Sequence, residues 1–503
     1  MRTIELDGSS LTIADVALAA EGGVRFVLAG AARARMSASR AVVDSIVDEG
    51  RTVYGITTGF GVFSEVAISP ADSRILQRNL VLSHCAGIGP PHDVRVVRAM
   101  MLLRANALAK GFSGIRIEVV EQMLTMLERD VVPVIPSQGS VGASGDLAPL
   151  AHLAAALMGV GECWVGAERI DAASALAAIG MKPVAYEPKE GLAMINGTQG
   201  IAAVGSLALH RASMLSDAAD LVGAMTLDAL LGTDAAFDPR IHAARPHAGQ
   251  VAVAANLRRF LAGSKLRESH RNCGKVQDAY SLRCMPQVHG AVRDALAFVR
   301  SKLEVEINAA TDNPLIFADD DEVVSGGNFH GAPVALACDV GAITVATLAS
   351  ISERRIERLV NPQLSGLPAF LVEDGGLNSG FMIAQVTAAA LVSESKTLAH
   401  PASVDSIPTS ANKEDHVSMG PGAAWKFARS VENLAGVIAI EALCAAQAID
   451  FHRPLESSAV IEEAHKVIRA RVGPWESDRY LHADLVAACE LLPKIAEIAG
   501  RRT

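Results

Sequence analysis

The sequence predicts a mainly α-helical protein, a long-helix bundle with a smaller N-terminal region that contains a glycine-rich loop and a few short strands. Hydrophobic residues make up 50% of the 503 residues, but aromatic residues only 4%. An interior filled by Ala, Val, Leu and Ile suits closely approaching helices better than a β-sandwich. Three long segments, 333–359, 380–397 and 422–449, are apolar on most faces. Such helices must be surrounded by others, in their own chain or in a neighbouring copy, so an oligomer is expected.

Local signals predict the shorter elements. Asp93 is a good N-cap, and apolar residues follow it at helical spacing until Gly111 stops the helix. A second helix is expected over 115–129. Two prolines and a run of Gly and Ser then break helicity, so residues 137–147 should form a loop. Residues 161–190 indicate a small patch that contains strands.

The domain organisation is only coarsely readable, because the chain carries no short repeat and no low-complexity linker. We expect an N-terminal region over residues 1–200, which holds the loop, and a helix bundle over residues 201–503, which forms the oligomer core. The boundary between them is approximate.

Charge and composition exclude several classes of protein. The net charge of −10 and the absence of a Lys/Arg-rich run argue against a nucleic acid partner. Seven cysteines without a C-x-x-C pair and an acidic N-terminus indicate a reducing, cytoplasmic setting. Segment 331–350 comes nearest to a membrane span, but Asp339 would cost about 2.5–3.5 kcal/mol there, so a buried helix is expected. Fourteen histidines form no cluster with metal-ligand spacing, so no metal site is expected.

The loop contains Ala143, Ser144 and Gly145, which can build an electrophile from the backbone itself. Because Gly145 has no Cβ, its amide nitrogen can reach the carbonyl carbon of Ala143. Ring closure and loss of water, including the Ser144 hydroxyl, leave an imidazolone with an exocyclic methylene. That group accepts a nucleophile such as an amine, a task that enzymes usually give to a cofactor. A lone Ala-Ser-Gly more often makes a tight turn, so the surrounding sequence must decide.

The surrounding string, GSVGASGDLAPLAH over residues 139–152, resembles the signature of the aromatic amino acid ammonia-lyases, which use a 4-methylidene-imidazol-5-one (MIO) group. Other blocks that look like this family follow in order along essentially the whole chain: 54–61 (YGITTGFG), 196–199 (NGTQ), 277–284 (QDAYSLRC), 311–314 (TDNP), 326–330 (GGNFH) and 414–419 (EDHVSM). The resemblance implies an MIO formed autocatalytically from Ala143, Ser144 and Gly145, with no external cofactor. It also implies a homotetramer whose active sites are shared between subunits.

The reaction that the resemblance implies is loss of ammonia from an aromatic amino acid. An electrophile bonded to the amine improves the leaving group, and a base then takes the β-proton. Tyr54 lies in a glycine-punctuated loop that suits a mobile lid. A free phenol has a pKa near ~10, so Tyr54 can act as a base only if its anion is stabilised nearby. Tyr280 is the second candidate for proton transfer or its support, and the sequence leaves open which group removes the β-proton.

Four further residues are expected to bind the substrate. Arg283 can hold a carboxylate with two parallel hydrogen bonds. If the stretch is helical, Tyr280 shares its face and Gln277 lies one turn earlier. Asn196 resembles the family asparagine that contacts the MIO and the substrate carboxylate region, and Phe329 resembles the aromatic wall beside the prosthetic group.

Two markers indicate the substrate. Histidine-using members of the family carry Ser-His at the positions of Ser83 and His84, and an imidazole can orient a substrate imidazole. Glu414 agrees, because a carboxylate suits an imidazole N–H, and it is also a candidate catalytic residue. Both markers predict L-histidine, converted to trans-urocanate and ammonia as the first step of histidine degradation. Lys413 departs from the pattern, since these members usually carry Gln there, and a cation beside Glu414 could change substrate preference.

Two alternatives stay open. The chain could be an MIO-dependent lyase or a 2,3-aminomutase acting on another aromatic amino acid. It could also be a catalytically silent homologue that acts in binding or assembly, because fold alone does not fix function.

Overall fold

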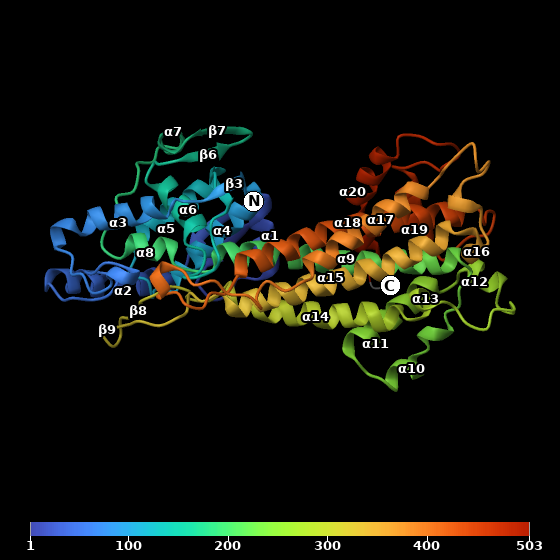
Figure 1. Ribbon diagram of the computed structural model, residues 1–503, viewed down its shortest axis with the longest axis horizontal. Helices are drawn as coiled ribbons and strands as arrows, with labels where there is room; N and C mark the ends of the chain where they lie inside the picture. The colour runs from blue at the N-terminus through green and yellow to red at the C-terminus, as the bar shows by residue number, and fades with distance from the viewer. Residues whose placement is uncertain (1, 502–503) are drawn as a thin grey trace. The chain divides into compact units, whose positions relative to one another are not determined.

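The computed structural model describes residues 2–501, which divide into two compact units. The first unit comprises Met1–His210, Arg300–Asp339 and Pro401–Trp425, and the second comprises Arg211–Val299, Val340–His400 and Lys426–Thr503. Within the described residues, twenty α-helices and nine short strands confirm the predicted mainly helical fold (Figure 1). Each unit is assembled from three separate segments, and the boundary near residue 200 stays a prediction.

The first unit contains eight complete α-helices among its described residues. They are α1 (Ile13–Glu21), α2 (Gly30–Asp48), α3 (Pro70–His84), α4 (Val94–Ala109), α5 (Ile117–Glu128), α6 (Ala148–Leu157), α7 (Ala172–Ala178) and α8 (Glu190–Ile195), with the short 3-10 helices η1 (Gly61–Phe63) and η4 (Ser410–Asn412). The predicted helices after Asp93 and over 115–129 are thus confirmed as α4 and α5. The Asp93 carboxylate accepts the N–H of Arg95, and Gly111 ends the segment with φ +83°.

All nine strands of the described chain also belong to the first unit. β1 (Thr3–Leu6) is parallel to β2 (Arg25–Leu28), and the antiparallel groups are β3 (Ile88–Pro91) with β5 (Pro136–Gln138), β4 (Val131–Pro133) with β6 (Glu162–Val165) and β7 (Glu168–Asp171), and β8 (Leu315–Phe317) with β9 (Glu322–Val324). The β6–β7 hairpin lies in segment 161–190, where the sequence predicted a strand-containing patch.

The second unit contains helices and irregular segments but no strand in the part of the chain that the structure describes. Its complete helices are α10 (Pro239–Ala243), α11 (Ala248–Leu261), α12 (Lys265–Ser269), α13 (Tyr280–Arg283), α16 (Pro362–Ser365), α17 (Met382–Leu398), α19 (Ala459–Arg469) and α20 (Leu481–Gly500), with η2 (Ala235–Phe237) and η3 (Ala369–Leu371). Four long helices contribute residues to both units: α9 (Gln199–Ala229), α14 (Met285–Glu306), α15 (Ala332–Val360) and α18 (Gly420–Asp450). The segments 333–359, 380–397 and 422–449 correspond to α15, α17 and α18.

Two of these helices, α15 and α18, are long and apolar enough to cross a membrane, but 67% and 89% of their most apolar windows are buried inside the protein. Asp339 within α15 is buried, and its carboxylate accepts the backbone N–H groups of Ala402 and Ser403 at 3.0 and 2.7 Å. A buried carboxylate with two backbone donors fits a core helix, as predicted for segment 331–350.

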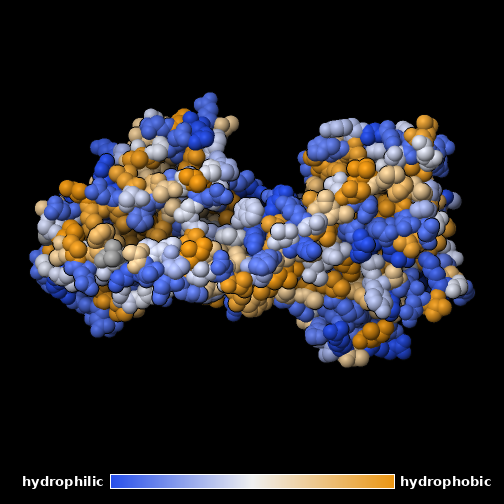
Figure 2. All heavy atoms as spheres, in the orientation of Figure 1, coloured by the Kyte–Doolittle hydropathy of each residue, from blue (hydrophilic) through white to orange (hydrophobic). Residues whose placement is uncertain are grey.

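Hydrophobic side chains also lie at the surface, interspersed among hydrophilic ones on the face shown in Figure 2. In the second unit they include Ile343 of α15 and Ile383 and Val386 of α17, which are 44%, 61% and 52% exposed. Contiguous groups of exposed aliphatic side chains mark interaction surfaces, whereas single ones are common on any protein surface.

Candidate active site

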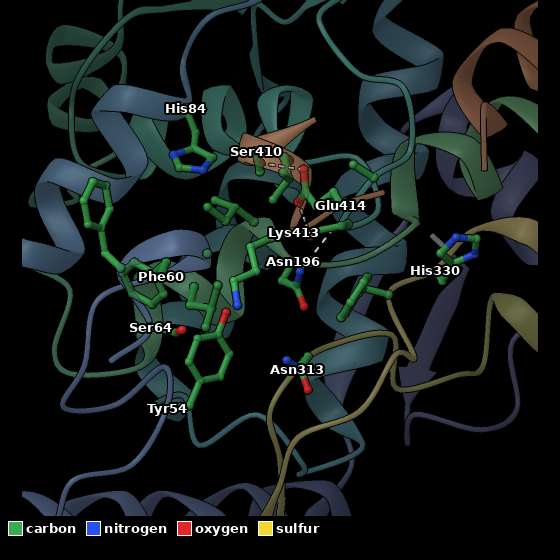
Figure 3. Close-up of a pocket in the computed structure, with 18 of the residues that line it drawn as sticks. Tyr54, Phe60, Ser64, His84, Asn196, Asn313, His330, Ser410, Lys413 and Glu414 are labelled. Carbon is green, nitrogen blue, oxygen red and sulfur yellow. Dashed lines mark hydrogen bonds between the residues drawn. The ribbon is translucent and has the colours of Figure 1, made fainter. Parts of the chain in front are cut away.

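A cavity of about 950 Å³ in the first unit gathers most of the predicted site residues (Figure 3). Its walls come from the loop after α2, the end of α3, the glycine-rich loop, the end of α8, and segments near residues 313–330 and 410–416. The predicted site residues among its lining are Tyr54, His84, Ala143, Ser144, Asn196, Phe329 and Glu414. Segments far apart in the sequence therefore meet around one space.

Gly145 does not line the cavity but packs against the backbone of Gly197. It has φ +70°, and a Cβ at this position would lie 2.2 Å from the Gly197 carbonyl oxygen. The next residue, Asp146, donates its backbone N–H to the same oxygen at 2.7 Å. Both the positive φ and the close approach require glycine at position 145.

The other side of the loop is held by Ser418. Its hydroxyl donates to the Gly142 carbonyl at 2.9 Å, and a Cβ on Gly142 would lie 2.3 Å from that hydroxyl oxygen. The backbone N–H of Met419 donates to Val141 at 2.9 Å. The segment 141–145 is thus fixed on both sides, and Ala143 and Ser144 face the cavity between the two anchors.

Asn196 connects the loop to the buried interior. Its Nδ2 donates to the Ser144 carbonyl oxygen at 3.1 Å, and its backbone carbonyl oxygen accepts from the fully buried Arg104 guanidinium at 2.9 Å. The Asn196 Oδ1 is buried and has no hydrogen-bond partner within the described chain. A buried unpaired acceptor beside a cavity is costly, so it is suited to receive a donor from a bound molecule.

Glu414 enters the cavity from a strained loop. The three residues before Lys413, namely Ser410, Ala411 and Asn412, have φ values of +49°, +52° and +66°. Consecutive left-handed residues other than glycine are costly, and they are usually found where function demands the geometry. In this loop conformation the backbones of Glu414 and Thr409 form an antiparallel bridge, and the Glu414 carboxylate points toward Ser144.

Three hydroxyl groups donate to the Glu414 carboxylate. Ser144 donates to Oε1 at 2.7 Å, and Thr409 and Ser410 donate to Oε2 at 2.7 and 2.6 Å. Burial alone would raise the pKa of Glu414, but these hydrogen bonds and the charge of His84 outweigh burial and hold the pKa below its usual value. Glu414 is therefore ionised at neutral pH.

His84, the last residue of α3, presents one ring nitrogen to the cavity. Its Nδ1 lies 2.8 Å from the Leu80 carbonyl oxygen, which can only accept, so the network assigns the proton to Nδ1. Burial lowers the pKa of His84, although the Leu80 carbonyl and the Glu414 charge partly oppose this. The imidazole is then neutral at pH 7, and its Nε2 is a hydrogen-bond acceptor.

Tyr54 lies on the opposite wall from His84 in Figure 3, with its hydroxyl pointing into the cavity. Burial raises the pKa of its phenol, the Gly61 backbone N–H lowers it, and the carboxylates of Glu414 and Asp312 raise it again. These groups together raise the pKa of Tyr54 above its usual value.

Gln277, Tyr280 and Arg283 belong to the second unit and do not line this cavity. The predicted polar stripe is wrong in one respect, because α13 begins only at Tyr280 and Gln277 precedes it in irregular chain. Asp278, between them, accepts the Thr233 backbone N–H at 2.7 Å, which holds the segment outside a helix. Within α13 the Arg283 guanidinium lies over the Tyr280 ring, 4.6 Å from its centroid.

The sequence did not single out several cavity residues. Asn313 and His330 fall inside blocks that resemble the family, and this was the only signal for them. Thr409 and Ser410 gave no signal, because their role depends on the left-handed loop that follows Thr409. Among residues 2–501, no group of three or more His, Cys, Asp or Glu side chains could hold a metal ion.

Comparison with known proteins gives both the enzyme class and the family. Residues 11–470 match the aromatic amino acid lyase family, so the chain belongs to this family and is a carbon–nitrogen lyase. It is 58% identical over 501 residues to a histidine ammonia-lyase of Anaeromyxobacter sp. (strain K), covering 98% of this chain and 99% of that relative.

Solved structures agree with the family assignment. A histidine ammonia-lyase from Trypanosoma cruzi has a TM-score of 0.93 and 47% identity, with coverage of 99% of this chain and 95% of that one. A tyrosine aminomutase from Streptomyces globisporus also has a TM-score of 0.93, with 37% identity and coverage of 99% and 97%. The shared fold thus supports more than one reaction on an aromatic amino acid.

Proposed function

We propose that the protein is a histidine ammonia-lyase, which deaminates L-histidine without oxidation to give trans-urocanate and ammonia, the first step of histidine degradation. The observation that carries this proposal is that a neutral His84 and an ionised Glu414 both line the cavity that Ser144 lines. The full-length similarity to histidine ammonia-lyases supports the same substrate.

The two groups suit an imidazole and not a phenyl ring. The His84 Nε2 or the Glu414 carboxylate can accept the single N–H of a neutral substrate imidazole, and an imidazolium, which has two N–H groups, can donate to both. A phenyl ring would leave the His84 Nε2 without a donor, at a cost of about 1–3 kcal/mol, whereas Glu414 would keep its hydroxyl donors.

We infer that Ala143, Ser144 and Gly145 cyclise into an MIO group without an external cofactor. The Gly145 nitrogen bonds to the Ala143 carbonyl carbon, and two waters leave, one with that carbonyl oxygen and one with the Ser144 hydroxyl. The tight fold of Gly145 against Gly197 and the Asn196 hydrogen bond to the Ser144 carbonyl fit this product. The group supplies an electrophile that turns the substrate amine into a better leaving group.

The remaining roles belong to side chains that bind the substrate and move its proton. Asn196, with its unpaired Oδ1, is placed to receive a donor from the substrate amino acid end, and Arg283 is the proposed carboxylate clamp. Phe329 is the proposed aromatic wall. Tyr54, and Tyr280 in support, are the proposed proton-transfer groups.

Arg283 does not line the cavity of its own chain, and a homotetramer with shared active sites would explain how it can still bind the substrate. Within the described lining, the cavity has no arginine, while Tyr280 on the second unit is 72% exposed. We propose that Gln277, Tyr280 and Arg283 complete the cavity of another subunit. The exposed aliphatic residues of α15 and α17 support an assembly of this kind. All seven cysteines are free, which supports the cytoplasm as its location.

The test is to follow absorbance in the urocanate band while purified enzyme is incubated separately with L-histidine, L-phenylalanine and L-tyrosine, with products identified by mass. A signal with L-histidine alone is the expected result. Preference for another amino acid would overturn the roles of His84 and Glu414 while leaving the proposed MIO in place.

A 2,3-aminomutase is the second candidate, because the tyrosine aminomutase shares the fold at a TM-score of 0.93. The products separate the two reactions. A mutase leaves a β-amino acid, whereas a lyase leaves only the conjugated acid and ammonia.

A further inference from the structure

Lys413 has no role in the function described above, yet it reaches into the cavity. Among the described residues that line the cavity, it is the only lysine or arginine. Figure 3 shows its side chain extending from the strained loop with the amino end directed toward the Tyr54 hydroxyl. It takes part in none of the ion pairs found among residues 2–501.

The loop holds the Lys413 backbone in place. The Lys413 backbone N–H donates to the Ser410 carbonyl at 3.2 Å, directly after the three left-handed residues. The neighbouring Glu414 carboxylate is turned to the hydroxyls of Ser144, Thr409 and Ser410. Because Glu414 obtains its partners from hydroxyl groups, the Lys413 ammonium is available to another anion.

Tyr54 needs such a cation if it is to act as a base. Burial raises its pKa, and the carboxylates of Glu414 and Asp312 raise it further against the single N–H of Gly61. The other titratable side chains that line the cavity are His84, Asp415, His330 and His416. Of these, His84 is neutral near pH 7 and Asp415 would oppose a phenolate. The nearby Lys189 is already paired with Asp312 at 2.7 Å.

We propose that Lys413 is a positioning residue for Tyr54, whose ammonium supplies the positive charge beside which the Tyr54 phenol ionises. The proposal rests on the proposed function, because it assumes that Tyr54 takes a proton from the substrate. The proton leaves the phenol for solvent before turnover, and the resulting phenolate receives the β-proton. Lys413 acts through its charge alone and exchanges no proton in this step.

A nearby opposite charge commonly shifts an ionisation by about one to three pH units, and a partly exposed ammonium belongs at the lower end of that range. Lys413→Gln keeps a polar side chain of similar reach but removes the charge. Lys413→Arg keeps the charge. Lys182→Gln removes the charge of an exposed lysine outside the cavity and serves as the matched control.

The first experiment measures kcat/KM for L-histidine against pH in these four proteins. We expect the acid limb of the Lys413→Gln profile to move up by about one pH unit, which lowers the rate about tenfold on that limb. Lys413→Arg and Lys182→Gln should keep the wild-type limb. A raised KM with an unmoved limb in Lys413→Gln would overturn the proposal, because it would assign the ammonium to the substrate instead.

The second experiment needs no turnover. The chain has only four tyrosines, so the phenolate absorbance of Tyr54 can be obtained by subtracting the titration of Tyr54→Phe. We expect this difference titration to move to higher pH in Lys413→Gln and not in Lys413→Arg. An unchanged difference titration would refute the proposal even in an inactive preparation. The other outcome is that the wild type fails to deaminate L-histidine while the difference titration still moves to higher pH in Lys413→Gln. That result would refute the proposed function and leave the effect of Lys413 on Tyr54 in place.

Discussion

The Ser144 hydroxyl donates a hydrogen bond to the Glu414 carboxylate at 2.7 Å, between residues 270 positions apart in the sequence. If Ser144 loses this hydroxyl when the loop cyclises, Glu414 Oε1 loses its donor while Oε2 keeps those from Thr409 and Ser410. One oxygen of an anchored, ionised carboxylate then becomes free beside the new electrophile. Maturation of the loop would thus also prepare an acceptor for the substrate.

Replacing Ser144 by Ala should prevent formation of the electrophile, although it also removes the hydroxyl that donates to Glu414. The variant has no hydroxyl to lose, so its intact mass can fall below its own calculated mass by one water molecule at most, whereas the wild type should be lighter by two. Activity should fall by at least about a thousandfold, because the electrophile is missing. A wild-type chain of full calculated mass would contradict the cyclisation itself. Circular dichroism of both proteins checks that the helical fold is intact.

Gly145→Ala should also block maturation, but for a steric reason. The new Cβ would lie 2.2 Å from the Gly197 carbonyl oxygen, so the loop or the start of α9 must shift. Gly180→Ala is the matched control, because Gly180 has a similar φ of +74° but nothing within 4 Å of its Cβ. The control should lose only the cost of a left-handed alanine, about 1–2 kcal/mol.

Mass and melting temperature of these two variants separate the effects. We expect Gly145→Ala to keep its full chain mass and to show no activity, whereas Gly180→Ala should mature and turn over normally. Full maturation of Gly145→Ala would mean that the contact with Gly197 does not hold the loop in position.

His84→Leu should weaken histidine selectivity without stopping maturation. The variant loses the Nε2 acceptor, so kcat/KM for L-histidine should fall by about 10- to 100-fold, the cost of one unpaired polar group. Turnover of L-phenylalanine should fall less or rise, since its ring needs no acceptor. Parallel assays of both substrates measure the ratio. Equal losses for the two substrates would mean that His84 supports the structure and does not read the ring.

The helices and the loop could be predicted from sequence because their signals are local. Asp93 and Gly111 mark the ends of α4, and the apolar faces of α15 and α18 require burial. The hydroxyl donors to Glu414 could not be predicted, because the left-handed run after Thr409 is carried by Ser410, Ala411 and Asn412, none of them glycine. Tertiary contacts force that conformation, and no local pattern reports it.

The prediction that Gln277 shares a helix with Tyr280 and Arg283 was wrong for a related reason. Spacing alone placed Gln277 on the face of Tyr280 and Arg283, but the Asp278 side chain holds the preceding segment to the Thr233 backbone. A side chain that hydrogen-bonds a distant backbone group competes with helix formation at its own position.

One fully buried histidine of the second unit, His289, predicts a pH dependence of stability. His289 is fully buried, with Nδ1 donating to Asp220 Oδ1 at 2.8 Å and Nε2 accepting from Arg355 Nη1 at 3.2 Å. Burial lowers the pKa of His289, the Asp220 hydrogen bond opposes this, and the Arg355 charge lowers it further. Arg355 is in turn paired with Glu441 at 2.6 Å.

Because the pKa of His289 is lower in the folded state than in the unfolded state, the unfolded chain binds more protons below about pH 6.5. The free energy of unfolding should therefore fall as the pH drops through 6.5, by at most about 1.4 kcal/mol per pH unit from this residue. His289→Gln can donate to Asp220 and accept from Arg355 but does not titrate. Melting temperatures at pH 7.5 and 5.5 should converge for wild type and variant as the pH falls, since only the wild type carries this penalty. If the difference in melting temperature between wild type and variant stays constant with pH, protonation of His289 does not destabilise the fold.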